Sequence, residues 1–311
     1  MTQELLNDEG TFDENKLKED NLDEEDFDEG DFDEDNLDEE DFDEGDFDED
    51  TFSDEDIVSE LDISHLVIED DTPVDNFQSE LQQRLLVEPL YSSQALPSPF
   101  LAAANVGLFY KLKGDPVVPD AMLSLGVQRA EDFSEKRNRT YLVWEFGKLP
   151  EVCIEIVSNT EGDELALSQK SRKRGKTIAK KDLYSQIGIR YYVVFNPLQQ
   201  IQGSNEMNGA LLRVWSISPE GYPELTPPQG ISSVSESVWL NAVGLGLTLW
   251  EGKFEEDVSR LWLRWCDRSG QVILTGAERA DLAEARAESA EAKARRLAER
   301  LRALGINPEE V

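Results

Sequence analysis

The fold is decided by the stretch Glu151-Val-Cys-Ile-Glu-Ile-Val157 and by the segments that follow it. Its β-branched and apolar residues predict a buried strand. Residues 178–187 predict a short helix that ends near Gly188, and Tyr191-Tyr-Val-Val-Phe195 predicts a second buried strand. Strand, helix and strand in this order are typical of an α/β arrangement around one sheet.

The neighbouring segments extend this α/β pattern in both directions. We expect further strands over residues 117–125, 139–146 and 211–217. We expect helices over residues 77–87 and over the alanine-rich segment 101–110, which prolines precede. From 276 to 304 the chain is rich in Ala, Glu and Arg with scattered Leu, which predicts one long helix. That helix is either a coiled-coil segment, through which two copies of the chain could form a homodimer, or a solvated helix stabilised by Glu–Arg pairs.

Two carboxylates and a lysine accompany the apolar segments. Asp120 follows Pro119 at a predicted strand, where Pro-Asp is also plain turn chemistry. Glu155 lies between apolar neighbours in a strand covered on both faces, so its carboxylate must pair, bind a metal or point out at the sheet end. Lys180 follows on the predicted helix. Two carboxylates on neighbouring strands with a nearby lysine are the minimum set for metal-assisted phosphodiester cleavage, because Mg²⁺ takes one or two carboxylates and completes its shell with water and phosphate oxygens.

The net charge of −37 is concentrated near the N-terminus. Residues 1–70 hold 34 Asp and Glu against two Lys, whereas residues 71–311 hold 33 acids against 28 Lys and Arg. The acidity therefore belongs to a tail. We divide the chain into an acidic low-complexity tail over residues 1–70, a folded domain over 71–270 and a helical segment over 271–311.

The tail contains an internal repeat. Apolar residues recur every five positions from Phe12 to Ile57, and a fifteen-residue unit at 21–35 is repeated at 36–50. The period resembles that of the pentapeptide-repeat family, which forms a square β-helix, but places that this family fills with small residues hold acids such as Glu25. We expect a disordered tail, because stacked carboxylates would repel one another. A DNA mimic, an inhibitory segment and a segment with no specific role all stay open.

Other residue types exclude several classes of protein. Two cysteines cannot build a disulfide framework. The single histidine, His65, excludes a histidine-type zinc site, and any Ser-His-Asp triad would have to use it. No basic segment followed by an apolar run marks a signal peptide, and no apolar run reaches the roughly 18 residues of a membrane span. We expect a cytoplasmic protein without a membrane partner.

From about residue 85 to 265 the chain resembles a known family. The resemblance is carried by Pro119-Asp120, Glu155-Ile-Val-Ser158, Lys180 four residues before Tyr184, and Tyr191-Tyr-Val-Val-Phe-Asn-Pro197. Flanking segments match as well: Gly244-Leu-Gly-Leu-Thr-Leu-Trp-Glu251 and Trp262-Leu-Arg-Trp-Cys-Asp267. In these segments the chain resembles the restriction endonuclease-like proteins that are abundant in cyanobacteria, a family of the PD-(D/E)XK nuclease superfamily.

This resemblance implies a restriction endonuclease-like core, in which helices flank a mixed central sheet, and Mg²⁺ or Mn²⁺ as the cofactor. It implies that Asp120 and Glu155 are metal ligands and that both act in catalysis together with Lys180. The superfamily places its lysine two residues after the second acid, where this chain has Val157. Lys180 on the following helix is therefore the candidate, and Lys181 is the reserve.

Two further segments have alternative interpretations. The basic residues 169–176 either contact phosphates or form a surface insertion. Glu88 is either an extra acid of the site or part of a Glu-Pro turn.

The function that we expect is that of a hydrolase, a Mg²⁺-dependent endonuclease that hydrolyses phosphodiester bonds in DNA. The alternative is an interaction module that keeps the nuclease fold without useful activity, with the acidic tail as a DNA-mimic or inhibitory segment.

Overall fold

The computed structural model describes residues 62–68, 76–167, 172–173, 175–305 and 307–308. Residues 60–311 form one compact unit. The acidic repeats lie outside the described residues, and so do residues 169–171 and 174 of the basic segment 169–176. None of the helices in the described ranges combines the length and the apolar character that crossing a bilayer requires.

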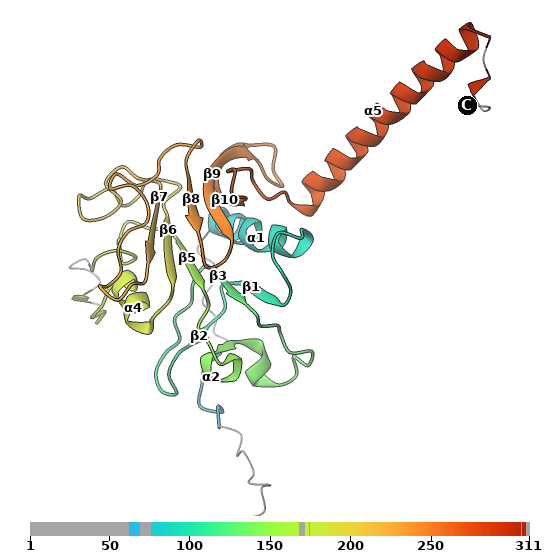
Figure 1. The fold of residues 1–311 in the computed structure, drawn as a ribbon. Coiled ribbons are helices and arrows are strands. Elements are labelled where there is room, and N and C mark those ends of the chain that lie inside the picture. Colours follow the sequence, from blue (N-terminus) through green and yellow to red (C-terminus); the bar gives the residue numbers. More distant parts are fainter. Residues whose placement is uncertain (1–61, 69–75, 168–171, 174, 306, 309–311) are drawn as a thin grey trace, which may run out of the picture. The chain divides into compact units, whose positions relative to one another are not determined.

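The centre of the unit is a five-stranded mixed sheet in the order β1-β3-β5-β6-β7 (Figure 1). Its strands are β1 (Phe100–Ala104), β3 (Ala121–Leu125), β5 (Val152–Ile156), β6 (Tyr191–Phe195) and β7 (Leu212–Ser216). The pair β5 and β6 is parallel, and every other pair in this sheet is antiparallel. Helix α4 (Lys180–Ile187) lies between β5 and β6 in the chain, so the predicted strand–helix–strand unit is confirmed.

A second, antiparallel sheet of three strands is formed by β8 (Ser237–Leu240), β9 (Leu245–Lys253) and β10 (Ser259–Cys266), in the order β10-β9-β8. Its apolar residues share one core with one face of the large sheet and with helix α1 (Phe77–Ser92). The opposite face of the large sheet packs in a separate core with Tyr184 of α4. The large sheet is therefore the middle layer of three, and its α4 side carries Glu155, because residues 153, 155 and 157 alternate onto the same face.

Helix α1 connects the two sheets through side chains as well as through its apolar face. The side-chain amide of Gln82 donates to the carbonyl of Leu263 (2.8 Å) and accepts from its N–H (2.9 Å), on the edge strand β10. The hydroxyl of Tyr91 does the same for Ala102 on the edge strand β1, at 3.0 and 2.9 Å. Side chains of α1 thus bond both the N–H and the carbonyl of one residue on an edge strand of each of these two sheets.

The helix expected over residues 101–110 is wrong. This segment forms β1 and the short strand β2 (Leu108–Phe109), separated by Asn105 with a left-handed φ of 53°. Alanine favours a helix only weakly, whereas β1 gains a complete five-pair ladder with β3. Its small side chains also fit a strand that is buried on both faces.

The strand expected over residues 139–146 is mostly wrong. Only β4 (Tyr141–Leu142) is a strand, and it pairs with β2 in parallel. A 3₁₀ turn, η1 (Lys136–Arg139), precedes it, and one helical turn, α2 (Val143–Phe146), follows and ends at Gly147, whose φ is 67°. β-Branched and aromatic residues favour a strand only where a partner strand is present, and β2 offers only two residues.

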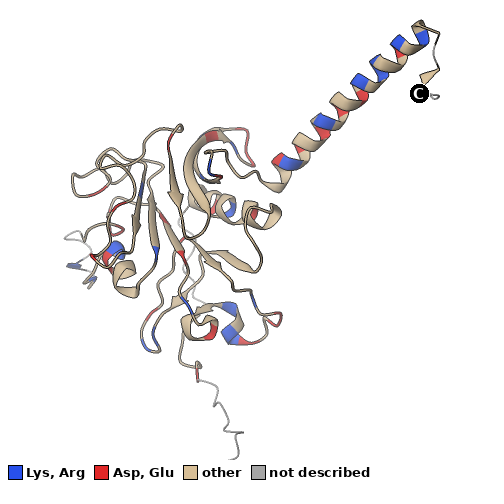
Figure 2. Cartoon of the chain, viewed as in Figure 1, with Lys and Arg blue, Asp and Glu red and all other residues tan. Residues whose placement is uncertain are grey.

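The long C-terminal helix, α5 (Gly276–Ala303), is confirmed. It begins at a capping box, in which Thr275 and Glu278 exchange side-chain and backbone hydrogen bonds. The buried Arg264 of β10 donates to both carboxylate oxygens of Glu278, at 2.7 and 2.6 Å. Beyond its first residues nearly all of α5 is exposed, and acidic and basic residues follow one another along its whole length (Figure 2).

Candidate active site

Asp120 lies immediately before β3, at the end of the large sheet. Ala121 pairs with Ile154, so Asp120 lies beside the last residues of β5. Its Oδ2 accepts from the Ile156 N–H at 2.6 Å, and its Oδ1 accepts from the Gln83 side chain of α1 at 2.9 Å. The Asp120 carboxylate is thus held in one orientation by a neighbouring strand and a helix.

Glu155 is the polar residue within β5, and it is only 1 % exposed. Its two oxygens accept from two residues of α4, spaced four positions apart and therefore on the same helix face. Lys180 Nζ donates to Oε2 at 2.6 Å, and the Tyr184 hydroxyl donates to Oε1 at 2.8 Å. The buried carboxylate is paired, which was one of the outcomes expected for it.

The two lysines at the start of α4 point to different places. Lys180 forms the ion pair with Glu155, whereas Lys181 Nζ lies 5.5 Å from the centroid of the Trp215 ring. Val157, where the superfamily would carry its lysine, is buried in the core on the same side of the sheet. Lys180 reaches the Glu155 carboxylate from the facing helix, and Lys181 does not.

A third carboxylate, Glu164, was not identified from the sequence. It is 6 % exposed, its backbone carbonyl accepts from the Lys181 N–H at 3.0 Å, and its Oε2 is buried without a hydrogen-bond partner in the described structure. Gln83 was missed as well. The i, i+4 spacing of Lys180 and Tyr184 was a readable signal for Tyr184, but nothing local marks Gln83 or Glu164, because a loop and a distant helix place them.

The carboxylates of the site hold protons more tightly than usual. Burial and, next, the charge of Glu155 raise the pKa of Asp120 to about 7. Burial also raises the pKa of Glu155, although Lys180 opposes this shift. Burial disfavours the charged form of Lys180, but the charge and hydrogen bond of Glu155 together with the charges of Glu164 and Asp120 outweigh burial and raise the pKa of the lysine. A bound cation would favour the ionised carboxylates and displace their protons.

The donor set fits a hard divalent cation that takes few protein ligands. Asp120 and Glu155 offer carboxylate oxygens, and Glu164 has an unpartnered acceptor close by. In the described part of the chain, no three His, Cys, Asp or Glu side chains gather as a ready metal cluster. Such a set suits Mg²⁺, which retains water and shares phosphate oxygens, better than a metal that needs a closed cage of side chains.

The other residues singled out in the sequence lie elsewhere. Glu88 is within α1, and its Oε1 accepts from the Gly276 N–H at 3.0 Å, so it holds the start of α5. His65 Nε2 lies 2.8 Å from the Leu112 carbonyl oxygen. Lys176, at the end of the basic segment, donates to the buried Asp163 at 2.6 Å.

Comparison with known proteins gave one family match. Residues 59–202 match the model of the Uma2 family, whose description is "Putative restriction endonuclease". The comparisons with curated proteins and with solved structures gave no match. The matched range contains Asp120, Glu155 and Lys180, and the restriction endonuclease-like resemblance seen in the sequence is confirmed. Residues 59–202, which bring the carboxylate pair and its lysine together, are therefore similar to the Uma2 family of putative restriction endonucleases.

Proposed function

We propose that this protein is an endonuclease that uses Mg²⁺ or Mn²⁺ to hydrolyse phosphodiester bonds in DNA. The observation that carries the proposal is the meeting of Asp120 and Glu155 at one end of paired strands, with Lys180 bound to Glu155. The match to the Uma2 family suggests a nuclease-like function; the metal, the DNA substrate and the residue roles are the proposal.

Asp120 and Glu155 would hold the cation, which supplies an activated water and stabilises charge on the phosphate. The Ile156 N–H and Gln83 keep Asp120 oriented, and the Tyr184 hydroxyl keeps Glu155 oriented. Preorganised groups of this kind avoid reorganisation at the moment of reaction. The Lys180 ammonium would stabilise the negative charge that develops on the phosphate or help to hold the attacking water.

The test is nicking of supercoiled plasmid with Mg²⁺ or Mn²⁺. Glu155→Ala and Asp120→Asn are expected to abolish metal-dependent cleavage. Asp182→Asn, an exposed carboxylate on the same helix as Lys180, is the matched control and should cleave like the wild type. Cleavage that survives Glu155→Ala would contradict the proposal. Cooperative folding without any cleavage would support the alternative, an interaction module with a nuclease fold.

We further propose that α5 associates with α5 of a second copy of the chain. Leu282 and Leu297 of α5 and Leu304 at its C-cap are 41 to 75 % exposed, and the helix runs for 28 residues. A helix polar on most of its surface gains stability when it buries such residues against a partner. Sedimentation of the full chain should give a dimer, and Leu297→Lys with Leu304→Lys should give a monomer. A monomeric wild type would overturn this.

A further inference from the structure

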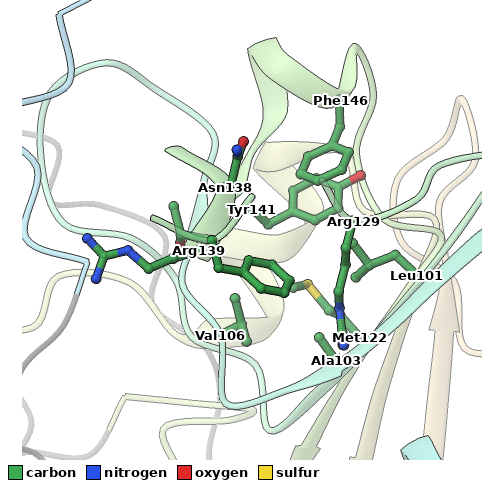
Figure 3. Close-up of a pocket in the computed structure, with 11 residues that line it drawn as sticks. Leu101, Ala103, Val106, Met122, Arg129, Asn138, Arg139, Tyr141 and Phe146 are labelled. Carbon is green, nitrogen blue, oxygen red and sulfur yellow. The ribbon is translucent and has the colours of Figure 1, made fainter. Parts of the chain in front are cut away.

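An apolar cavity of about 440 Å³ lies on the same face of the large sheet as the carboxylates. Leu101 and Ala103 of β1 and Met122 of β3 line one side of it (Figure 3). Tyr141 and Phe146, whose rings stack with centroids 4.3 Å apart, line another side. Its volume is within the range of roughly 300–1,000 Å³ that is typical of small-molecule pockets.

The cavity adjoins the site along β3. Met122 is two residues after Asp120, so the two side chains belong to the same face and their Cα atoms are about 7 Å apart along an extended chain. Ala103 is the registered partner of Met122 on β1. A ligand in the cavity would therefore lie next to a phosphate at the carboxylates.

The rim of the cavity combines an exposed aromatic ring with positive charge. Phe133 lines the cavity and is 52 % exposed. Arg129 also lines it, donates to the Ala102 carbonyl at 2.7 Å, and forms no ion pair with any residue that the structure describes. An exposed phenyl ring offers a stacking surface, and an arginine without a carboxylate partner complements a phosphate.

We propose that this cavity receives one unpaired nucleobase of the nucleic-acid substrate, with its phosphate at Arg129. The inference rests on the proposed function and narrows its substrate to DNA with an unpaired base near the cleaved bond. A paired base cannot enter, because its faces are covered by its neighbours in the stack, whereas a bulged or single-stranded base exposes both faces to Phe133 and to the aromatic wall.

The test measures binding to labelled oligonucleotides by fluorescence anisotropy, with EDTA present so that no cleavage occurs. The full chain is titrated with a paired duplex, the same duplex with a one-nucleotide bulge, and the single strand. We expect the bulged duplex or the single strand to bind at least about 5-fold tighter than the paired duplex, since one stacked base contributes on that order. The arm that binds tighter identifies the source of the unpaired base.

Three variants connect that preference to the cavity. Phe133→Ala should weaken binding of the unpaired base about 5- to 10-fold, whereas Phe77→Ala, which removes an 87 % exposed phenyl from α1, should not. Ala103→Leu should fill the cavity and remove the preference without lowering the thermal midpoint. Arg129→Gln should weaken all DNA and reduce the salt dependence by about one phosphate contact.

The outcomes separate this proposal from the nuclease proposal. Three results would overturn the proposal that the cavity receives an unpaired base. They are equal binding of paired and unpaired DNA, equal effects of Phe133→Ala and Phe77→Ala, and no binding to any oligonucleotide. Plasmid cleavage alongside any of these results would leave the nuclease intact. A preference for the unpaired base in a protein that cleaves nothing would keep the cavity and reject the nuclease.

Discussion

Glu155 shows at the scale of single residues how a charge is kept inside a sheet. Its oxygens have one donor each, from Lys180 and Tyr184, and the lysine side chain remains 36 % exposed while the glutamate side chain is 2 % exposed. The ion pair therefore has one buried end and one end in contact with solvent. Loss of the lysine would therefore leave a buried carboxylate without its countercharge.

Removal of Lys180 should destabilise the fold as well as the chemistry. Lys180→Met leaves Glu155 buried without its countercharge, and we expect a loss of about 1–3 kcal/mol, below the roughly 3–5 kcal/mol of a fully buried pair because water reaches the lysine. Lys181→Met, which removes only a contact with Trp215, should cost less than about 1 kcal/mol. Urea unfolding measures both.

A double variant separates the uncompensated charge from lost packing. Lys180→Met combined with Glu155→Gln should recover most of the stability that Lys180→Met loses, because no buried charge remains. If the double variant is less stable than Lys180→Met alone, the pair does not account for the effect.

At the scale of elements, the strength of local patterns decides what the sequence predicts. β5, α4 and β6 were predicted because each satisfies propensity, burial pattern and end signals together, as with Gly188 in the left-handed region at φ 95°. The conformations of β1 and of the segment around β4 were predicted wrongly because they depend on the strands available for pairing. Local residue preferences favoured a helix for β1 and a longer strand around β4. In the same way local patterns point to Asp120, Glu155 and Lys180 as candidates, while Gln83 and Glu164 depend on packing between elements that no local spacing records.

Gly188→Ala tests how much the end of α4 depends on glycine. An added Cβ would meet Leu149 Cδ1 at an ordinary 3.6 Å, so the cost is conformational rather than steric. We expect about 1–2 kcal/mol of destabilisation from a left-handed alanine, measured by thermal or urea unfolding. An Asp182→Ala variant on the exposed face of α4 serves as the control, and equal stability of the two variants would reject the reasoning.

The start of α5 should loosen in acid. Burial of Glu278 opposes its ionisation, but hydrogen bonds from Arg264 and the Thr275 N–H outweigh the burial and lower its pKa below the ordinary 4.5. The stabilisation is therefore complete above pH 4.5 and is lost as the pH falls through the lowered value. Glu278→Gln should lower the thermal midpoint at pH 7 and have a much smaller effect near pH 3. A difference that is constant across this range would contradict the assignment.

At the scale of the whole molecule, charge is divided unequally along the chain. Residues 1–70 hold 34 acids against two Lys and so carry most of the net charge of −37, and DNA is itself an anion. A truncated protein that begins at residue 60, where the compact unit starts, should bind DNA more tightly than the full chain. The gain should shrink between 50 and 200 mM salt, as the DNA titration will show. Equal affinity at both salt concentrations would mean that the tail does not act through its charge.

The side-chain bonds of Gln82 and Tyr91 to the two edge strands have a consequence for hydrogen exchange. An edge amide that faces outward normally exchanges quickly, because water is its only partner. The Leu263 and Ala102 N–H groups have partners on α1 instead, so both should exchange slowly and with the same free energy of opening, although they belong to different sheets. That free energy would be the one needed to open α1, and the next residue of the helix, Gln83, would release Asp120 in the same event.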